Sequence, residues 1–468
     1  MSLLDALNIA TSSLRTTQAS ISVISENVAN SQNANYADRS PIVTELPANG
    51  GVELAGVQRA TDQALRQQTL QQSSQSSGDA ALSSLYGQLD DATGASSGTP
   101  PLASAMAQLQ TAWQSFEATP EDVAAQQSVI QAGTGVTQAI GNASQAVDQL
   151  ATTAAGDVGT DVTTLNTDLA QIAQLNQQIV AATATNTPAP DLEDQRDAAV
   201  ASVAKLVSIN TVARPDGSLS VFTPNGLSLV DKAAISFAWD GTNITASGST
   251  TSLNSSFQNG SIGATLGFLR TDGAAVQSTD PRLGALQKLR DQLNGFASSL
   301  YDRTATPPPA FEAAYDNATT QTGEQATAFF TTSDGSATAT SSNLVVNPAI
   351  LNGTAQIKQA AATPVVAALT ETDQSLNAGA LAVTGVSYSQ LANAILANTS
   401  SNAGTISSAA KTSTATTTAL TSRLASETGV NVDNEMSNLI VLQNSYAAAA
   451  RVATTIDSML TSLMAIGQ

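Results

Sequence analysis

The chain has 468 residues, of which 17 are lysine or arginine and 37 are aspartate or glutamate, so its formal net charge is −20. It has no cysteine and no histidine, which excludes disulfides, cysteine or histidine zinc sites, thiol nucleophiles and histidine acid–base catalysis. The basic residues are scattered singly rather than clustered, so nucleic acid is not an expected partner.

The two ends of the chain, residues 3–28 and 432–463, each carry an apolar stripe with helical spacing. Apolar side chains recur at alternating intervals of four and three residues, which is the seam of a coiled coil. The predicted inter-subunit seam consists of Leu3, Leu7, Leu14, Ile21, Ile24, Val28, Leu439, Leu442, Tyr446, Ile456, Leu460 and Leu463. Because alanine and threonine dilute both stripes, seam burial does not offset the chain entropy lost on ordering. We therefore expect segments 1–34 and 432–468 to be disordered in the isolated chain and to order against neighbouring copies; a plain intramolecular helical hairpin is the alternative.

Between the ends, helical periodicity dominates. The predicted helical body comprises residues 35–206, 282–330 and 376–431. Alternating and β-branched residues between 208 and 246, separated by Asp-Gly and Asn-Gly turns, predict small antiparallel strands. We expect residues 207–281 to form a β-rich outer domain together with residues 331–375. The predicted fold is thus mainly α with a β insertion: terminal helices in a coiled-coil-type hairpin, a helical-bundle body and a small antiparallel β domain.

No stretch has the pattern of a cleaved signal peptide or of a membrane span. The first residues lack a basic segment before an apolar run, and long uncharged runs such as 374–410 are full of asparagine, serine and glycine. No membrane insertion is expected. If the protein leaves the cell, we expect it to do so uncleaved, by a dedicated route.

The densest charged cluster is the sequence Asp-Leu-Glu-Asp-Gln-Arg-Asp at 191–197. On a helix Asp191 and Asp194 share a face, and Arg196 can pair with neighbouring carboxylates. Since no histidine, cysteine or second acidic cluster accompanies it, we expect no catalysis, no metal and no cofactor here. The preferred interpretation is structural: Asp191, Asp194, Arg196 and Asp197 form an acidic first turn with a paired arginine that anchors this helix to the β unit.

Several of these segments resemble the flagellar hook-associated protein 1 family. The N-terminal run through Gln18, Asn27, Asn30, Tyr36 and Arg39 is similar to a signature shared by flagellar rod, hook and hook-associated proteins. Five interior and C-terminal stretches are similar to the hook-associated family in particular: Trp113 to Asp122, 191–209, 215–230, Phe329-Phe330 and 429–463. The chain departs from the shared signature at Ala34-Asn35, where the family usually has Pro-Gly.

The resemblance implies a structural subunit, not an enzyme, that lies outside the cell in the bacterial flagellum and acts as an adaptor at the hook–filament junction. It implies export by the flagellar type III apparatus and polymerisation through the terminal helices. The implied partners are other copies of the chain, the hook protein, the second hook-associated junction protein and an export chaperone on the C-terminal tail. Another axial protein of the hook or distal rod is an alternative, and a secreted adhesin or hydrolase with a helical stalk is a third.

Overall fold

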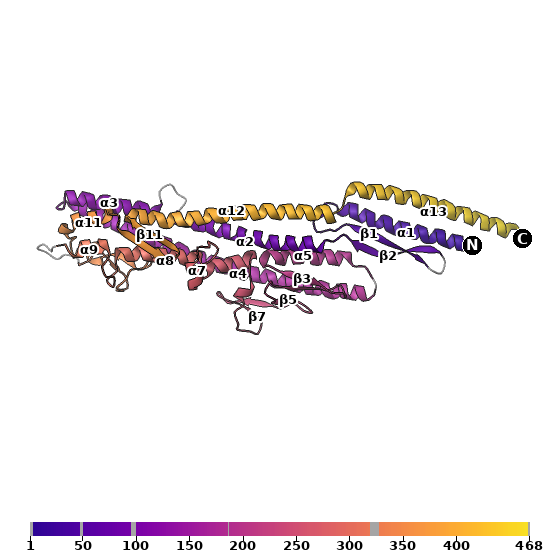
Figure 1. The fold of residues 1–468 in the computed structure, drawn as a ribbon, viewed down its shortest axis with the longest axis horizontal. Coiled ribbons are helices and arrows are strands. Elements are labelled where there is room, and N and C mark those ends of the chain that lie inside the picture. The colour runs from indigo at the N-terminus through magenta and orange to yellow at the C-terminus, as the bar shows by residue number, and fades with distance from the viewer. Residues whose placement is uncertain (1–2, 47–49, 95–99, 186, 319–326, 467–468) are drawn as a thin grey trace.

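The computed structural model describes residues 3–46, 50–94, 100–185, 187–318 and 327–466, and these form a long, mainly helical rod (Figure 1). Both chain termini lie at one end of this rod, and the bulk of the helices and small sheets lies at the other. Within the described residues, no helix is both long enough and apolar enough to cross a membrane.

The narrow end of the rod consists of the first and last helices and one β-hairpin. These elements are α1 (Leu3–Asn30), β1 (Arg39–Leu46), β2 (Gly51–Arg59) and α13 (Val432–Ile466). The hairpin lies along α1, where the Thr16 hydroxyl donates to the carbonyl of Val52 over 3.0 Å. Gly51 permits this close approach, because a β-carbon at that position would lie 2.6 Å from the Ser12 Oγ atom.

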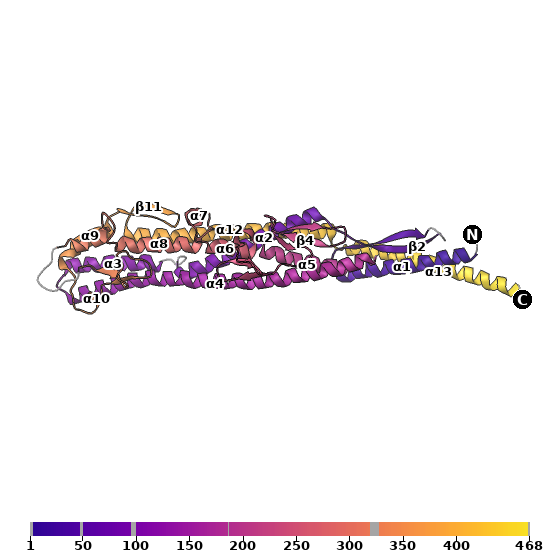
Figure 2. The same ribbon diagram turned by 90° about the horizontal axis from the view of Figure 1, so that it is seen from below.

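Five helices build the long axis of the body: α2 (Gln63–Thr93), α3 (Pro101–Ala118), α4 (Val123–Ala184), α5 (Pro190–Leu206) and α12 (Tyr388–Thr428). The 62-residue α4 runs along most of the body, as Figure 2 shows. Local sequence sets the helix starts. The Asp62 and Asp122 carboxylates accept backbone N–H groups at the first turns of α2 and α4, and Ser387 with Gln390 forms a capping box at α12.

Shorter elements cover these long helices. The helices are α6 (Gly260–Leu269), α7 (Gly273–Gln277), α8 (Ala285–Leu300), α9 (Ala310–Asp316), α10 (Pro348–Leu351) and α11 (Ala362–Thr370). One three-stranded sheet contains β3 (Asn210–Ala213), β4 (Leu219–Phe222) and β5 (Ser228–Val230). The remaining strands pair as β6 (Phe237–Trp239) with β7 (Ile244–Ala246), β8 (Phe330–Thr332) with β9 (Leu344–Val346), and β10 (Gln374–Ala378) with β11 (Leu381–Val386).

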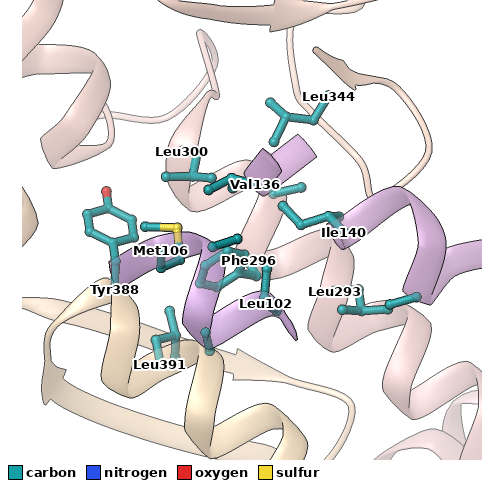
Figure 3. Close-up of a cluster of buried hydrophobic side chains, with 14 of the residues drawn as sticks. Leu102, Met106, Val136, Ile140, Leu293, Phe296, Leu300, Leu344, Tyr388 and Leu391 are labelled. Atoms are coloured by element: carbon teal, nitrogen blue, oxygen red, sulfur yellow. The ribbon is translucent and has the colours of Figure 1, made fainter. Parts of the chain in front are cut away.

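The larger hydrophobic core lies at the end of the rod away from the termini. Trp113 is fully buried there, and its ring meets those of Phe116, Phe311, Tyr315 and Phe329 at centroid separations between 5.4 and 6.2 Å. Side chains from α3, α4, α8 and α12 point toward one another in this core (Figure 3). Edge-to-face ring contacts add to the area-dependent stabilisation of such a core.

The smaller core lies between the second half of α4, helices α5 and α6, and strands β4 to β7. Val162 and Leu169 of α4, Val203 of α5, and Val221 and Phe237 of the strands are each at most 4% exposed. The β unit is therefore fastened directly to the long helix. The prediction of a mainly α chain with a helical body and a small antiparallel β insertion is confirmed.

The predicted grouping of residues 207–281 with residues 331–375 in one β-rich domain is wrong. Leu344, Val346 and Val365 belong to the larger core around Trp113, whereas the strands after α5 belong to the smaller one. Residues 260–277 are also mostly helical, as α6 and α7. The physical reason for the first difference is that residues 331–375 bury their apolar side chains against the helices of the larger core. Gly133 of α4 makes room for the segment that leads into β8, because a β-carbon there would lie 2.7 Å from the Phe329 ring.

Candidate functional site: the terminal helix pair and its junction with the body

Helices α1 and α13 pack side by side in opposite directions, so the two termini lie together at the tip of the rod (Figure 1). Near the body, Asn27 hydrogen-bonds Glu435 over 3.0 Å. At the tip, Leu3 and Met459 line the same groove. The two helices therefore lie against each other from the body to the tip.

The predicted seam lies at this helix pair but is incompletely covered. Ile24 and Ile456 are buried. Eight further seam residues are half-buried: Leu3, Leu7, Leu14, Ile21, Val28, Leu439, Leu442 and Leu460. Tyr446 and Leu463 remain 40% and 62% exposed. The structure thus shows the intramolecular helical hairpin that the sequence left as the alternative to disorder, with a seam that one partner helix covers only in part.

Large apolar side chains also project away from the seam of α13. The exposed ones are Val432, Met436, Ile440, Val441, Val452, Met459 and Met464, and Leu4 is exposed on α1. At the tip, a groove of about 400 Å³ opens between the helices, lined by Leu3, Thr455, Ser458, Met459, Ser462 and Leu463. An exposed apolar surface on a long helix marks a site of contact with another molecule.

The base of the helix pair is held by polar contacts around Asn27, which is fully buried. Its amide nitrogen Nδ2 donates to Asp38 Oδ1 and to the carbonyl of Arg39, each over 2.8 Å, and to Glu435 Oε2. Its Oδ1 atom accepts from the Tyr36 hydroxyl at 2.9 Å and from the Arg39 backbone N–H at 3.2 Å. One side chain therefore ties together α1, the connection to β1 and the first turn of α13.

Arg39 continues these contacts into the body. Its guanidinium is 3% exposed and pairs with Asp191 at 2.6 Å and with Asp194 at 2.7 Å, both on α5, while stacking over the Tyr36 ring. Burial alone would lower the pKa of Arg39, but the hydrogen bonds to Asp194 and Asp191 raise it above the ordinary value. Asn27, Tyr36, Asp38, Arg39, Glu435 and the acidic turn of α5 are hereafter called the junction cluster.

Two more arginines face the same acidic turn. Arg59 at the end of β2 pairs with Glu193 at 2.9 Å, Asp194 at 2.6 Å and Asp197 at 2.8 Å. Arg66 on α2 also pairs with Asp197. The carboxylates predicted to share a helix face therefore do meet, but their partners come from more than a hundred residues earlier in the chain.

Arg196 does not join these ion pairs. Its Nη1 atom donates to the carbonyl of Gly217 at 2.7 Å and to Asn176 Oδ1 at 3.3 Å, which connects α5 to the β3–β4 turn and to α4. Burial lowers the pKa of Arg196. The pairing of Arg196 with neighbouring carboxylates is not found, whereas its contact with the β unit is.

Sequence reasoning missed Arg59, Arg66 and the Asn27–Glu435 bond. From the sequence, Asn27 and Arg39 are recognised only as parts of a shared signature. Buried ion pairs between distant segments leave no periodic signal. Among the described residues, no cluster of acidic groups is arranged to hold a metal ion.

Comparison with known families agrees with this architecture. Residues 86–307, from the end of α2 through both cores to the region after α8, match the family model described as the flagellar hook-associated protein FlgK helical domain. Over these residues the chain is similar to the FlgK helical domain. Residues 424–466, which include α13, match the model described as the flagellar basal body rod FlgEFG protein C-terminal.

Individual proteins are similar to parts of the chain. A stretch of 234 residues is 29% identical to flagellar hook-associated protein 1 of Escherichia coli strain K12 and 28% identical to that of Salmonella typhimurium strain LT2. Each match covers 48% of this chain and 42% of the relative, so it spans less than half of the length of either FlgK relative. A solved structure described as the flagellar hook junction protein FlgK from Burkholderia pseudomallei aligns with a TM-score of 0.46 at 24% identity, over 57% of this chain and 46% of that one.

Replacing Arg39 by methionine should open the junction cluster. The change removes one of the two arginines that pair with Asp194. Because Arg59 still pairs with it, the loss should lie at the lower end of the range of about 3–5 kcal/mol that losing one partner of a buried ion pair typically costs. We expect the free energy of unfolding, measured by urea with circular dichroism, to fall by about that amount. Arg290→Met is the matched control, because the side chains of Arg290 and its partner Asp148 are 32% and 62% exposed. Losing this exposed pair should lower the free energy of unfolding by less than about 1 kcal/mol. Equal losses in the two variants would contradict the buried role of Arg39.

Tyr36 gives the junction cluster a dependence on alkaline pH. Burial raises the pKa of Tyr36 from 10.0 to about 12, with Arg39 opposing and nearby carboxylates adding to the shift. A raised pKa stabilises the fold below pH 10, and this contribution is lost as pH rises through 12. Near neutral pH the free energy of unfolding of the wild type should exceed that of Tyr36→Phe by about 1 kcal/mol, because the variant lacks the hydrogen bond to Asn27. Urea unfolding at pH 8 and pH 11 should show a smaller gap at pH 11; a gap that widens would contradict the assignment.

Proposed function

We propose that the protein is a structural subunit of the bacterial flagellum that acts as an adaptor at the hook–filament junction and polymerises through α1 and α13. The observation that carries this proposal is the terminal helix pair: many apolar residues of α13 stay exposed although it packs against α1. The FlgK helical domain supports the junction role, and the rod-protein match of 424–466 supports an axial place for α13.

The composition of the terminal helices supports repeated side-by-side packing. Four residues of the 35 in α13 are charged: Asp433, Glu435, Arg451 and Asp457. Exposed apolar residues lie on both flanks of its seam, with Met436 and Ile440 on one side and Val441 and Val452 on the other. Further copies can therefore bury these flanks at little cost in charge desolvation, and the apolar area gained stabilises association by about 25 cal/mol per Å².

The body takes no part in that packing in this proposal. Its apolar side chains are gathered in two filled cores, and its surface is rich in serine, threonine, glutamine and asparagine. We infer that it faces outward, with the hook protein on one side and the second hook-associated junction protein on the other. The protein has no enzymatic role in this proposal.

Secretion is the remaining part of the proposal. The similarity to FlgK supports a location in the flagellum, outside the cell, and we infer export by the flagellar type III apparatus without a cleaved signal peptide. The exposed apolar flanks of α13 favour an export chaperone on the C-terminal tail, because a helix of this kind aggregates unless it is covered. The chaperone and polymerisation therefore compete for the same surface.

A second candidate is another axial protein, of the hook or distal rod. The match of residues 424–466 to the C-terminal model of flagellar basal body rod proteins favours it. The helical domain over residues 86–307 favours the junction protein instead. Labelling of assembled flagella separates the two, since the junction protein should be confined to the hook–filament boundary.

Amide hydrogen exchange on the isolated protein should identify the terminal pair as its least stable part. Exchange protection follows buried apolar contacts, and α13 has few buried residues, whereas α4 has many. We expect α13 to exchange at least about 100-fold faster than the centre of α4, with the fastest exchange at the tip. Equal protection of both helices would contradict an assembly interface that is remodelled by neighbouring copies.

The double substitution Leu442→Asp and Leu460→Asp should abolish incorporation into the flagellum. Both side chains are half-buried on the seam, and a carboxylate there must lose its hydration on packing. The body should remain folded, as judged by thermal unfolding and protease resistance. The control Asn444→Asp and Thr461→Asp adds the same charges at exposed positions of α13 and should still assemble. Normal motility of the seam variant would count against the proposal.

A further inference from the structure

The apolar seam of α13 repeats every seven residues and so does not by itself fix where α13 lies along α1. Leu439, Tyr446, Ala453 and Leu460 form one row, and Leu442, Ala449, Ile456 and Leu463 form the other. Sliding α13 by seven residues places one apolar residue where another was. Coiled-coil seams of this kind hold several registers of similar stability unless a polar contact selects one.

Glu435 interrupts this repeat. Among the residues of α13 whose burial the structure describes, 432–465, every other buried or half-buried side chain is apolar. Glu435 is 7% exposed, and its Oε2 atom accepts from Asn27 Nδ2. The Asn27 side chain is itself fixed by Tyr36, Asp38 and the Arg39 backbone, so the donor cannot follow a sliding helix.

The connection from α12 restricts the possible slip to one direction. The carbonyl of Thr428 at the end of α12 accepts from the Asp38 backbone N–H at 2.8 Å, and residues 429–431 alone lead to α13. Three residues span at most about 10 Å, so α13 cannot move a heptad outward toward the tip. It can move inward by looping out its first turns, which would place Leu442 opposite Asn27 and leave the buried amide facing an apolar side chain.

We propose that the hydrogen bond from Asn27 to Glu435 is a register lock that selects one axial position of α13 on α1. The lock also decides where along the rod the exposed apolar residues on the flanks of α13 lie. It is a property of the single chain and stands whether or not the helices enter a flagellum. Asn27 and Glu435 act as positioning residues: they specify the pairing rather than supply most of its stability.

The absence of cysteine allows a direct test with spin labels on the full-length protein. Gln18 of α1 and Thr461 of α13 are exposed and lie at different levels along the helix axis, and each can be replaced by cysteine and labelled. The distance distribution between the labels, measured by pulsed electron resonance, should show one narrow population in the otherwise wild-type chain. In Glu435→Leu, a second population at shorter distance should appear, because an inward slide by one heptad moves the α13 label about 10 Å along the helix axis toward the level of Gln18.

Two matched variants distinguish register selection from simple stabilisation. Glu435→Gln keeps an oxygen that accepts from Asn27 and should retain the single distance. Asp433→Leu makes a similar change of charge and polarity at an exposed position of the same helix turn and should also retain it.

Three outcomes would overturn the lock. The first is an unchanged single distance in Glu435→Leu. The second is a loss of helical circular dichroism with a featureless distribution in that variant, which would give the bond a purely stabilising role. The third is a featureless distribution in the labelled wild type, which would show that no register is selected before assembly.

Discussion

The whole arrangement depends on a buried charge network at the base of the terminal helices. Arg39 lies between Asn27 on one side and the carboxylates of Asp191 and Asp194 on the other. A buried cation is tolerated only when anions and hydrogen bonds surround it, so the segments that supply them are held in one geometry. The network thereby joins the two ends of the chain, the β1–β2 hairpin and α5 at a single place.

The body and the terminal helix pair, which lie on either side of this network, differ in how completely their apolar side chains are buried. The body fills two cores with side chains such as Trp113 and Phe296, which are fully buried, so its shape is set within one chain. The terminal pair leaves residues such as Val441 and Leu463 mostly exposed. The proposed adaptor role needs this contrast: a body that keeps its shape, and an axial part whose surface is completed by neighbours.

Much of the fold could be read from local patterns. The alternating spacing of four and three predicted both terminal helices, and Asp-Gly and Asn-Gly turns located the strands after α5. The grouping of residues 331–375 with the strands after α5 failed because these residues pack into the larger core, where the Phe329 ring lies against Gly133 of α4. Space for the Phe329 ring is a property of two segments nearly 200 residues apart, and no local pattern reports it.

The sequence by itself determined the helical periodicity, the acidic turn at 191–197, the lack of metal and thiol chemistry through cysteine or histidine, and the family likeness. These follow from residue type and spacing within one segment, where sterics and hydrophobic periodicity act over a few residues. Tertiary structure alone decided that Arg39, Arg59 and Arg66 neutralise that turn, that Arg196 contacts Gly217 instead, and that Glu435 meets Asn27. The partner of a buried charged group depends on which distant segments the fold brings together. A buried charge is stabilised by the groups within about 3 Å of it, at any separation along the chain.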